Sequence, residues 1–218
     1  MNIDLLKWRE NLSEIFITGG AGFIGKRLAL SLRESGHGVC VFDNLQPQVH
    51  PNPEGAVAEL QKANVRFIRG NVLDGDALRE AICSAGTDII VHLAAETGTG
   101  QSYDLPAHYC DVNVTGTARV IEALKAARNG GGDVRRVILA GSRAVYGEGA
   151  CRNTEEREVT AVPRLSADLA AGDFVPKDSK GCPLEAIASR AATTVPAPAS
   201  VYASTKLMQE YLLRQGLG

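Results

Sequence analysis

A tyrosine and a lysine four residues apart near the end of the chain, Tyr202 and Lys206, could carry out proton transfer. Residues with this spacing lie on one face of a helix, so the lysine ammonium would be held beside the tyrosine phenol. A free phenol is a poor base near neutrality, but a neighbouring ammonium stabilises the phenolate. Tyr202 could then exchange a proton with a hydroxyl group of a substrate. Such pairs also occur by chance on many helices, so the rest of the sequence must give this one its meaning.

A serine stands where an apolar run over 134–140 ends, in the sequence Ala140-Gly141-Ser142. If that run is a parallel strand, Ser142 lies at the carboxyl edge of the sheet, where ligands bind in this architecture. Its hydroxyl could donate to the reacting oxygen and accept from the tyrosine. The alternative is a turn serine that caps its own backbone.

A glycine-rich turn follows the first predicted strand and contains Gly19, Gly22 and Gly25. The first glycine permits a tight turn, the second removes a side chain where phosphates come close, and the third lets the helix pack against the sheet. Phosphates would then lie at a helix N-terminus, where N–H groups and the helix dipole favour negative charge. The alternative is a turn that serves chain geometry alone.

A carboxylate, Asp43, stands at the end of the second predicted strand, eighteen residues after Gly25. This position is typical of dinucleotide-binding units. The carboxylate could accept hydrogen bonds from both ribose hydroxyls and would repel a 2′-phosphate. The sequence therefore predicts NAD as the cofactor, and a reductase that uses NADPH is the weaker interpretation.

Apolar runs alternate with segments of helical periodicity through the first two thirds of the chain. This alternation predicts a Rossmann-type, doubly wound parallel α/β sheet with right-handed crossovers. The strands are expected at 14–18, 39–42, 65–69, 88–93 and 134–140, and the helices at 23–33, 54–63, 76–84, 105–128 and from 201 almost to the terminus.

The NAD-binding domain is expected over 14–147 and 201–218, after an N-terminal extension, 1–13, that could form a short amphipathic helix. The insert 148–200 is rich in Ala, Pro, Arg, Glu and Asp and lacks sustained strand or helix periodicity. Long segments of this kind are usually functional or mobile, so we expect it to run over the mouth of the site.

Composition limits the class of protein. The 218 residues are 44% hydrophobic and 22% charged, which favours a globular chain without a membrane span. A net charge of -2 provides no basic field for nucleic acid. The five cysteines are odd in number and widely spaced, which favours reduced thiols in a cytoplasmic protein. Cys151 and Cys182 are isolated thiols and predict no metal site.

Several motifs together resemble the extended short-chain dehydrogenase/reductases, in particular the nucleotide-sugar epimerases and dehydratases. They are Gly19 to Gly25, Asp43, His92-Leu93-Ala94-Ala95, Asn113, Ser142, Val145-Tyr146-Gly147 and Tyr202 to Lys206. Within that family, Ala95 to Ser102, the turn Tyr146 to Gly149 and the long insert look most like the dTDP-L-rhamnose 4-epimerases. The resemblance covers most of the chain.

The resemblance implies roles for particular residues. Ser142, Tyr202 and Lys206 would be catalytic, Lys206 would also hold the nicotinamide ribose, and Asn113 would order the central helix. The implied cofactor-binding residues are Gly19, Gly22, Phe23, Ile24, Gly25, Asp43, Asn44, Asn71, Val72, Leu93, Ala94, Ala95, Tyr202 and Lys206. The implied substrate-binding residues are Glu96, Thr97, Ser142 and Arg143, the substrate is a dTDP- or UDP-hexose, and the assembly is a homodimer.

Two departures from the family pattern help to choose among activities. Sugar 4,6-dehydratases carry an Asp-Glu pair directly after the catalytic hydroxyl residue, whereas this chain has Arg143 and Ala144. Dehydration is therefore disfavoured, while 4-epimerisation through a 4-keto sugar needs no such pair. At the adenine end, Asn71 stands where the family usually has Asp, and its amide is expected to keep the contact.

The family continues past the Tyr-Lys helix into a sixth strand and a C-terminal domain that recognises the sugar nucleotide. The sequence stops at Gly218, so this domain is expected to be largely absent. Two hypotheses follow: an NAD-dependent nucleotide-sugar 4-epimerase, or a catalytically weak or silent NAD-binding module. The residues that would identify the sugar lie mostly outside the sequence.

Overall fold

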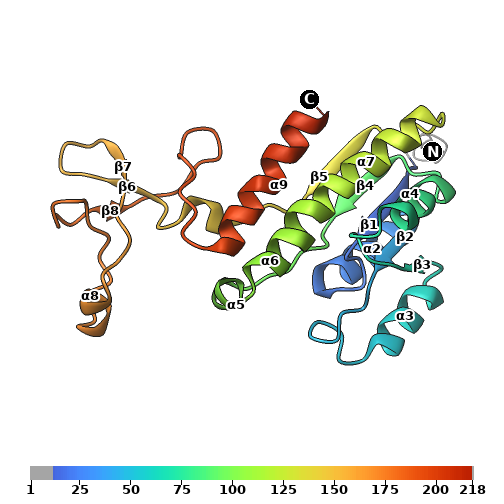
Figure 1. Cartoon of the computed structure of the whole chain (residues 1–218), viewed down its shortest axis with the longest axis horizontal. Coiled ribbons are helices and arrows are strands. Elements are labelled where there is room, and N and C mark those ends of the chain that lie inside the picture. The colour runs from blue at the N-terminus through green and yellow to red at the C-terminus, as the bar shows by residue number, and fades with distance from the viewer. Residues whose placement is uncertain (1–11, 218) are drawn as a thin grey trace, which may run out of the picture. The chain divides into compact units, whose positions relative to one another are not determined.

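The computed structural model describes residues 12–217, which fall into two compact units (Figure 1). Of the described residues, unit 1 comprises 12–96, Ala107–Ala140 and 209–217, and unit 2 comprises Thr97–Pro106 and Gly141–Met208. The amphipathic helix expected at the N-terminus falls outside the described residues and stays a prediction.

Unit 1 is built on a parallel sheet of five strands in the order β3-β2-β1-β4-β5. The strands are β1 (Glu14–Thr18), β2 (Gly38–Asp43), β3 (Arg66–Arg69), β4 (Ile89–His92) and β5 (Arg136–Leu139). The chain proceeds from β1 outward to β3 and then returns to the other side of β1 at β4. This reversal brings the carboxyl ends of β1 and β4 to the position where doubly wound sheets bind ligands. The Rossmann-type sheet predicted from the sequence is confirmed.

Helices cover both faces of this sheet (Figure 1). They are α2 (Phe23–Glu34), α3 (Pro53–Lys62), α4 (Gly75–Ser84) and α7 (Gly116–Asn129). Successive residues of a strand point to opposite faces, so β1 contributes Phe16 to one apolar cluster and Ile17 to the other. Phe16 shares its cluster with Leu78 of α4 and Leu124 of α7, whereas Ile17 shares its cluster with Leu60 of α3. Burial on both faces explains why the inner strands β1, β2 and β4 are largely apolar.

The helices of unit 1 differ in how their N-termini are capped. Asn52 accepts a hydrogen bond from the Gly55 amide at the start of α3, and Asp74 accepts one from the Ala77 amide at the start of α4, each at 3.0 Å. Such caps satisfy amides that have no partner within the helix. Helix α2 instead follows Gly22 at its N-cap position, and no side chain caps it.

The sequence predicts one regular α-helix over 105–128, and the structure differs from this prediction. This region consists of α6 (Pro106–Tyr109), a π-helical segment η1 (Cys110–Thr115) and α7. The Asn113 side chain in η1 bonds to the backbone of Glu96. Wider π-helical turns often occur where a side chain must reach a functional segment. The periodicity predicts a helix here but carries no information about a partner seventeen residues away.

Unit 2 contains short elements and a small sheet of its own. The elements are α5 (Thr99–Asp104), a 3₁₀ turn η2 (Arg143–Tyr146), β6 (Ala150–Arg152), β7 (Glu158–Thr160), α8 (Ser166–Ala170) and β8 (Glu185–Ala186). The antiparallel sheet has the order β7-β6-β8 and packs Cys151, Ala161 and Leu184 into a small apolar cluster. The absence of regular structure expected for 148–200 is therefore wrong. Strands of two or three residues are too short to produce a visible alternation in the sequence.

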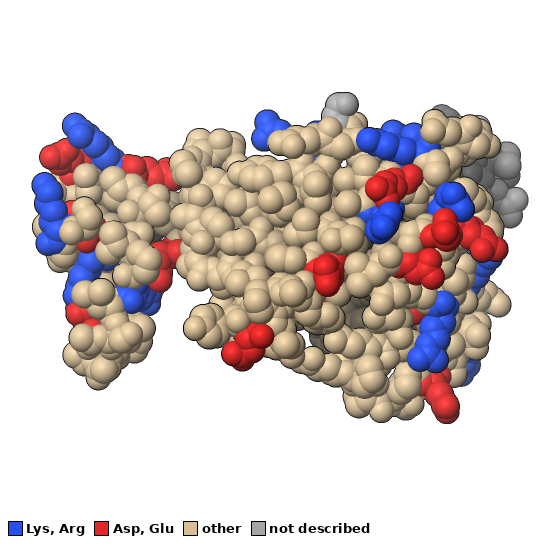
Figure 2. All heavy atoms as spheres, viewed as in Figure 1, with Lys and Arg blue, Asp and Glu red and all other residues tan. Residues whose placement is uncertain are grey.

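Helix α9 (Val201–Leu217) begins in unit 2 and ends in unit 1. No helix within residues 12–217 is long and apolar enough to span a membrane. On the face drawn in Figure 2, acidic and basic side chains are interspersed, in keeping with the net charge of -2.

Candidate functional site

Helix α9 carries the tyrosine and the lysine one turn apart, as their spacing predicts. The helix begins directly after Ser200, whose hydroxyl oxygen accepts a hydrogen bond from the Ala203 amide at 3.1 Å. This cap fixes the first turn of the helix, where Tyr202 lies. Tyr202 is partly buried and Lys206 is only 4% exposed. A lysine is rarely buried to this degree unless its ammonium has polar partners.

The Ser142 hydroxyl is the hydrogen-bonding partner of the Tyr202 phenol. The Tyr202 Oη donates to Ser142 Oγ at 3.4 Å, a long hydrogen bond. Ser142 Oγ also accepts from the Ala144 amide at 3.2 Å, which caps η2. The two interpretations of this serine, turn cap and partner of the tyrosine, therefore hold together. Because Ser142 accepts both bonds, its own hydrogen is available to donate.

A glycine holds the turn that follows η2. Gly147 has φ +58° and ψ −121°, a conformation that side chains rarely adopt. A Cβ at this position would lie 2.2 Å from the Ala197 carbonyl oxygen. The Ala197 amide in turn donates to the Val145 carbonyl at 2.9 Å. The segment after Ser142 and the segment before α9 are thus tied together within unit 2.

The glycine turn of unit 1 has the backbone geometry that the sequence predicts, with one difference. Gly19 has φ +67°, and a Cβ there would lie 2.6 Å from the Ala94 amide nitrogen. A Cβ on Gly25 would lie 2.6 Å from the Gly19 carbonyl oxygen and equally close to Gly20 Cα. Close contact with the turn itself, rather than with the sheet, therefore requires glycine at position 25.

Gly22 differs from the other two glycines, because a Cβ there would meet only the Gly19 carbonyl oxygen, at 3.3 Å. The protein thus has nearly enough room for a side chain, but the helix N-terminus there has no capping side chain and no acidic residue in its first turn. Such an N-terminus attracts anions. The following Phe23 and Ile24 are exposed, and only their backbone would contact a phosphate. These residues fit the pyrophosphate of NAD.

The predicted ribose carboxylate, Asp43, is buried at the end of β2 and is already hydrogen-bonded. Its Oδ2 accepts from the Ala21 amide at 3.0 Å, and its Oδ1 accepts from the Leu45 amide at 2.8 Å. The bond to Ala21 links the carboxylate directly to the glycine turn. His50 Nε2 lies 3.4 Å from Asp43 Oδ1, and both side chains are almost fully buried.

The remaining predicted cofactor residues lie in unit 1 at the carboxyl ends of strands or just beyond them. Asn44 and Asn71 are exposed and use their side-chain oxygens to accept from the amides of Gln46 and Leu73. Val72 packs in the core with Phe16 and Leu78. Leu93, Ala94 and Ala95 follow β4 and are partly buried. The roles of all these residues in binding NAD stay predictions.

Among the predicted substrate residues, Glu96 is the most constrained. Its amide donates to Asn113 Oδ1 at 2.8 Å, and its carbonyl accepts from Asn113 Nδ2 at 3.1 Å. Its carboxylate Oε1 lies 3.1 Å from Nε2 of His108, whose side chain is half-exposed. In unit 2, Thr97 and Arg143 are exposed.

A buried polar network joins β1, β4, α7 and α9 within unit 1. His92 Nδ1 lies 2.7 Å from Thr18 Oγ1, and His92 Nε2 lies 3.0 Å from Thr117 Oγ1. Gln209 Nε2 donates to Thr117 Oγ1 at 2.8 Å, while Thr117 donates to the Asn113 carbonyl at 2.6 Å. Gln209 Nε2 also lies 3.5 Å from His92 Nε2, so the histidine, the threonine and the glutamine form one connected buried group.

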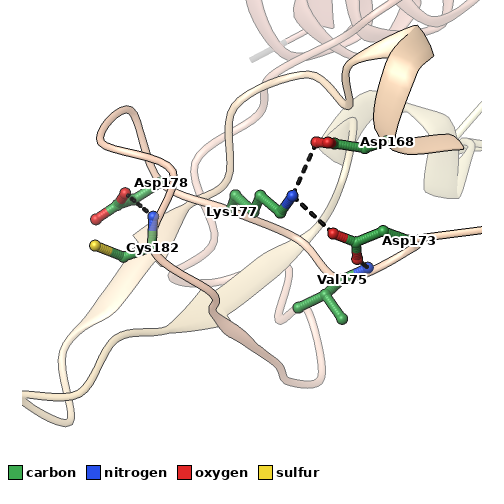
Figure 3. Close-up of polar contacts among 6 residues, drawn as sticks. All are labelled: Asp168, Asp173, Val175, Lys177, Asp178 and Cys182. Carbon is green, nitrogen blue, oxygen red and sulfur yellow. Dashed lines mark hydrogen bonds and ion pairs between the residues drawn. The ribbon is translucent and has the colours of Figure 1, made fainter. Parts of the chain in front are cut away.

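Lys177, in the loop after α8, is paired with two carboxylates (Figure 3). Lys177 Nζ lies 2.7 Å from Asp173 Oδ2 and 2.9 Å from Asp168 Oδ2. The hydrogen bond from Lys177 lowers the pKa of Asp173, and the bonds to Asp173 and Asp168 raise the pKa of Lys177. The Cys182 amide donates to Asp178 and lowers the pKa of that carboxyl. A cavity of about 300 Å³ lies beside this loop, lined in part by Leu165 and Val175.

All five cysteines of the chain are free thiols. Within the described part of the chain, no group of three or more His, Cys, Asp or Glu side chains is placed to hold a metal ion. Burial raises the pKa of the Cys40 thiol to about 11 and also raises that of the Cys151 thiol.

The sequence interpretation missed His50, Gln209 and the pairing of Glu96 with His108. A histidine seven residues after Asp43, between Pro47 and Pro51, belongs to no periodic pattern. Gln209 is a fully buried polar residue in a helix, and only its tertiary partners reveal it.

Comparisons with known proteins agree with the motifs. A profile of the NAD dependent epimerase/dehydratase family matches residues 15–167. The dTDP-L-rhamnose 4-epimerase of Burkholderia thailandensis is 40% identical over 201 residues, covering 92% of this chain and 53% of that protein. The UDP-glucose 4-epimerase of Yersinia enterocolitica is 33% identical over 136 residues, covering 62% of this chain and 38% of that protein.

Among solved structures, the UDP-glucose 4-epimerase from Brucella ovis in complex with NAD matches with a TM-score of 0.62 and 27% identity, over 92% of this chain and 46% of that one. The chain thus spans about half the length of the B. thailandensis and B. ovis proteins. The motif resemblance and the predicted cofactor class are confirmed at the level of the family. With its parallel sheet, glycine turn and matching profile, the chain belongs to the NAD-dependent epimerase/dehydratase family.

Proposed function

We propose that this chain supplies the NAD-binding and proton-transfer residues of a nucleotide-sugar 4-epimerase that works through a 4-keto sugar. The observation that carries the proposal is the hydrogen bond from the Tyr202 phenol to Ser142 Oγ at 3.4 Å, with Lys206 one helical turn further along α9. A phenol, a hydroxyl and an ammonium gathered in this way are suited to moving a proton on and off a sugar hydroxyl.

The proton chemistry follows from the hydrogen bonds of the side chains. Tyr202 would take the proton from the C4 hydroxyl as the carbonyl forms and return it when the hydroxyl is restored. Ser142 accepts from Tyr202 and from the Ala144 amide, so its own hydrogen can be donated to the C4 oxygen. Lys206, buried one turn away, would stabilise the phenolate form of Tyr202.

NAD, when bound, would supply the redox chemistry by accepting hydride from C4 of the sugar and returning it to the opposite face. The residues of this chain that would hold it are the glycine turn, with the phosphates at the N-terminus of α2, and Asp43 at the adenosine ribose. Asn71, Val72 and Leu93 to Ala95 would line the rest of the cofactor site.

Epimerisation is favoured over dehydration by the residues after Ser142. A 4,6-dehydratase needs an acid and a base to eliminate water, and Arg143 and Ala144 at these positions provide neither. Arg143 is exposed and Ala144 uses its amide to bond to Ser142. We assign Arg143, together with Glu96 and Thr97, to binding of the sugar nucleotide.

The finer assignments are a dTDP-hexose as substrate, a homodimeric assembly and a cytoplasmic location. The substrate rests on the likeness to the dTDP-L-rhamnose 4-epimerase of B. thailandensis. The dimer rests on the family resemblance alone. The location rests on the five free thiols, which suit a reducing compartment.

The decisive experiment compares wild type with Tyr202→Phe. The purified chain is incubated with NAD and a panel of dTDP- and UDP-hexoses, and the products are separated by chromatography. We expect wild type to form the C4 epimer of one of these sugars and Tyr202→Phe to lose at least about 10²-fold in turnover, because the general acid-base group is removed.

Tyr211→Phe is the matched control, because Tyr211 lies on the same helix with an exposed side chain. This control should keep wild-type turnover. An active Tyr202→Phe variant would overturn the proposed role of the tyrosine. Binding of NAD by wild type without turnover of any sugar would favour a silent NAD-binding module instead.

A further inference from the structure

The loop that follows β2 folds back so that a histidine lies against the predicted ribose carboxylate. Asp43 Oδ1 accepts from the Leu45 amide at 2.8 Å, and the His50 amide donates to the Gln46 carbonyl at 3.0 Å. Leu45 is a bulky residue with φ +57°, in the left-handed region that such residues rarely occupy. Strained residues of this kind often occur at ligand sites.

The histidine is buried together with the carboxylate. His50 Nε2 lies 3.4 Å from Asp43 Oδ1, and the two side chains are 6% and 5% exposed. A polar ring and a carboxylate are rarely buried to this extent without a partner. The two groups therefore restrict each other's orientation.

We propose that His50 is a positioning residue for the adenosine ribose of NAD and that it acts through Asp43, an inference that rests on the proposed function. A carboxylate has about four acceptor sites, two on each oxygen. The amides of Ala21 and Leu45 occupy one on each, and His50 faces the second site on Oδ1. The second site on Oδ2 would then accept from a ribose hydroxyl.

The proposal separates positioning from mere space filling. If His50 only fills space, truncating it lowers the stability of the fold and weakens the binding of every nucleotide to the same degree. If His50 fixes the Asp43 carboxylate, truncation weakens the binding of only those ligands that have a ribose hydroxyl for Asp43 to bind. The telling quantity is therefore the ratio of two dissociation constants, one for NAD and one for NAD that lacks the 2′-hydroxyl on its adenosine ribose.

The experiment measures both dissociation constants by titration calorimetry for wild type, His50→Leu, His50→Gln and Asp43→Asn. A hydrogen bond to a charged group contributes enough to binding that wild type should prefer NAD over the 2′-deoxy analogue by about tenfold. His50→Leu should lower this preference to about twofold. His50→Gln, which keeps a donor near the position of Nε2, should retain most of it.

The Asp43→Asn variant shows how small the preference for NAD over the 2′-deoxy analogue becomes when the carboxylate is lost. His37→Leu is the matched control for His50→Leu. The His37 ring accepts from the Ser13 amide, away from the carboxylate, so its variant should keep the tenfold preference. A His50→Leu variant that keeps the full preference overturns the inference while leaving the proposed function intact.

The other outcomes are also decisive. Equal affinity of wild type for NAD and its 2′-deoxy analogue overturns the ribose role of Asp43, and the role of His50 with it, but not NAD binding. Failure of wild type to bind NAD at all overturns the proposed function itself. A thermal unfolding curve for each variant verifies that the protein used in the titration is folded.

Discussion

Asn113 bonds to both backbone polar groups of Glu96, accepting its amide hydrogen at 2.8 Å and donating to its carbonyl at 3.1 Å. These two hydrogen bonds link the π-helical segment η1 to the backbone at Glu96, four residues after the end of β4. All these atoms are buried, so no solvent would replace the bonds if they were lost.

Replacing Asn113 with alanine should therefore destabilise the protein strongly. Two buried backbone groups would lose their partner, and each such loss costs about 1 to 3 kcal/mol. The free energy of unfolding measured in urea should fall by about 3 kcal/mol. Asp111→Ala, an exposed change in the same segment η1, should cost far less. Equal costs for the two variants would contradict the assignment.

Removing the Ser142 hydroxyl should impair catalysis more than folding. Ser142→Ala removes the partner of the Tyr202 phenol, and we expect turnover to fall by about 10²-fold, with NAD affinity nearly unchanged. Kinetics with the preferred sugar nucleotide and titration with NAD measure the two effects separately.

The control for Ser142 must also lose a bond to a backbone amide. Ser189 is suitable, since its Oγ accepts from the Ala150 amide at 3.1 Å within the same unit. Ser189→Ala should retain turnover. If both serine variants lose activity to the same degree, the loss reflects backbone support rather than chemistry.

The thiols should divide into two classes. Cys83, Cys110 and Cys182 are exposed, whereas Cys40 and Cys151 are buried. At pH 8 a thiol with a pKa of about 11 is ionised in only about one molecule in a thousand, so Cys40 is unreactive as well as shielded. A thiol reagent should label three cysteines in the native protein and five in urea. Fast labelling of Cys40 in the native state, identified by mass spectrometry, would refute its burial.

Alkaline pH should weaken the fold through Cys40. The unfolded chain releases this proton near the ordinary pKa of 9.0, whereas the folded chain releases it near about 11. Between these values the folded state holds one more proton, so the free energy of unfolding falls as pH rises from about 9 to about 11, by about 2 kcal/mol. Urea titrations of wild type and Cys40→Ala across this range measure the effect. The variant should show a shallower decline, and parallel curves would count against the prediction.

The loop around Asp173 and Lys177 in unit 2 should keep its hydrogen bonds at acidic pH (Figure 3). The hydrogen bond from Lys177 lowers the pKa of Asp173. The bond that the Val175 amide donates to the Asp173 carboxylate is therefore present above the ordinary carboxyl pKa and lost as pH falls through the lowered one. The Val175 amide signal in an NMR pH titration reports this step. Lys177→Met should move the midpoint upward, whereas Lys180→Met should not.

The elements of unit 1 could be predicted closely because each depends on local patterns. The strand expected at 14–18 is found as Glu14–Thr18, and the helix expected at 54–63 is found as Pro53–Lys62. Buried apolar runs, helical periodicity and the glycine turn can each be recognised from residues that are close together in the sequence. The alternation predicts a doubly wound sheet, but the strand order, with its reversal at β4, comes from the structure.

Features that depend on distant partners could not be predicted in this way. The π-helical segment arises from bonds between Asn113 and Glu96, and the contact of His50 with Asp43 arises from a loop without periodicity. The strands of unit 2 are too short to leave a pattern. The pairing of Ser142 with Tyr202 was expected, but only because both residues matched motifs sixty positions apart.

The three glycines of the phosphate turn would have different fates in a relative that no longer needed its cofactor. Gly19 is required by the Ala94 backbone and Gly25 by the turn itself, so selection for folding alone would preserve them. Gly22 meets only one protein atom, at 3.3 Å. In relatives that no longer bind a nucleotide, position 22 would be the first of the three to accept other residues. The residue at this position would therefore distinguish a functional dinucleotide site from one that keeps only the fold.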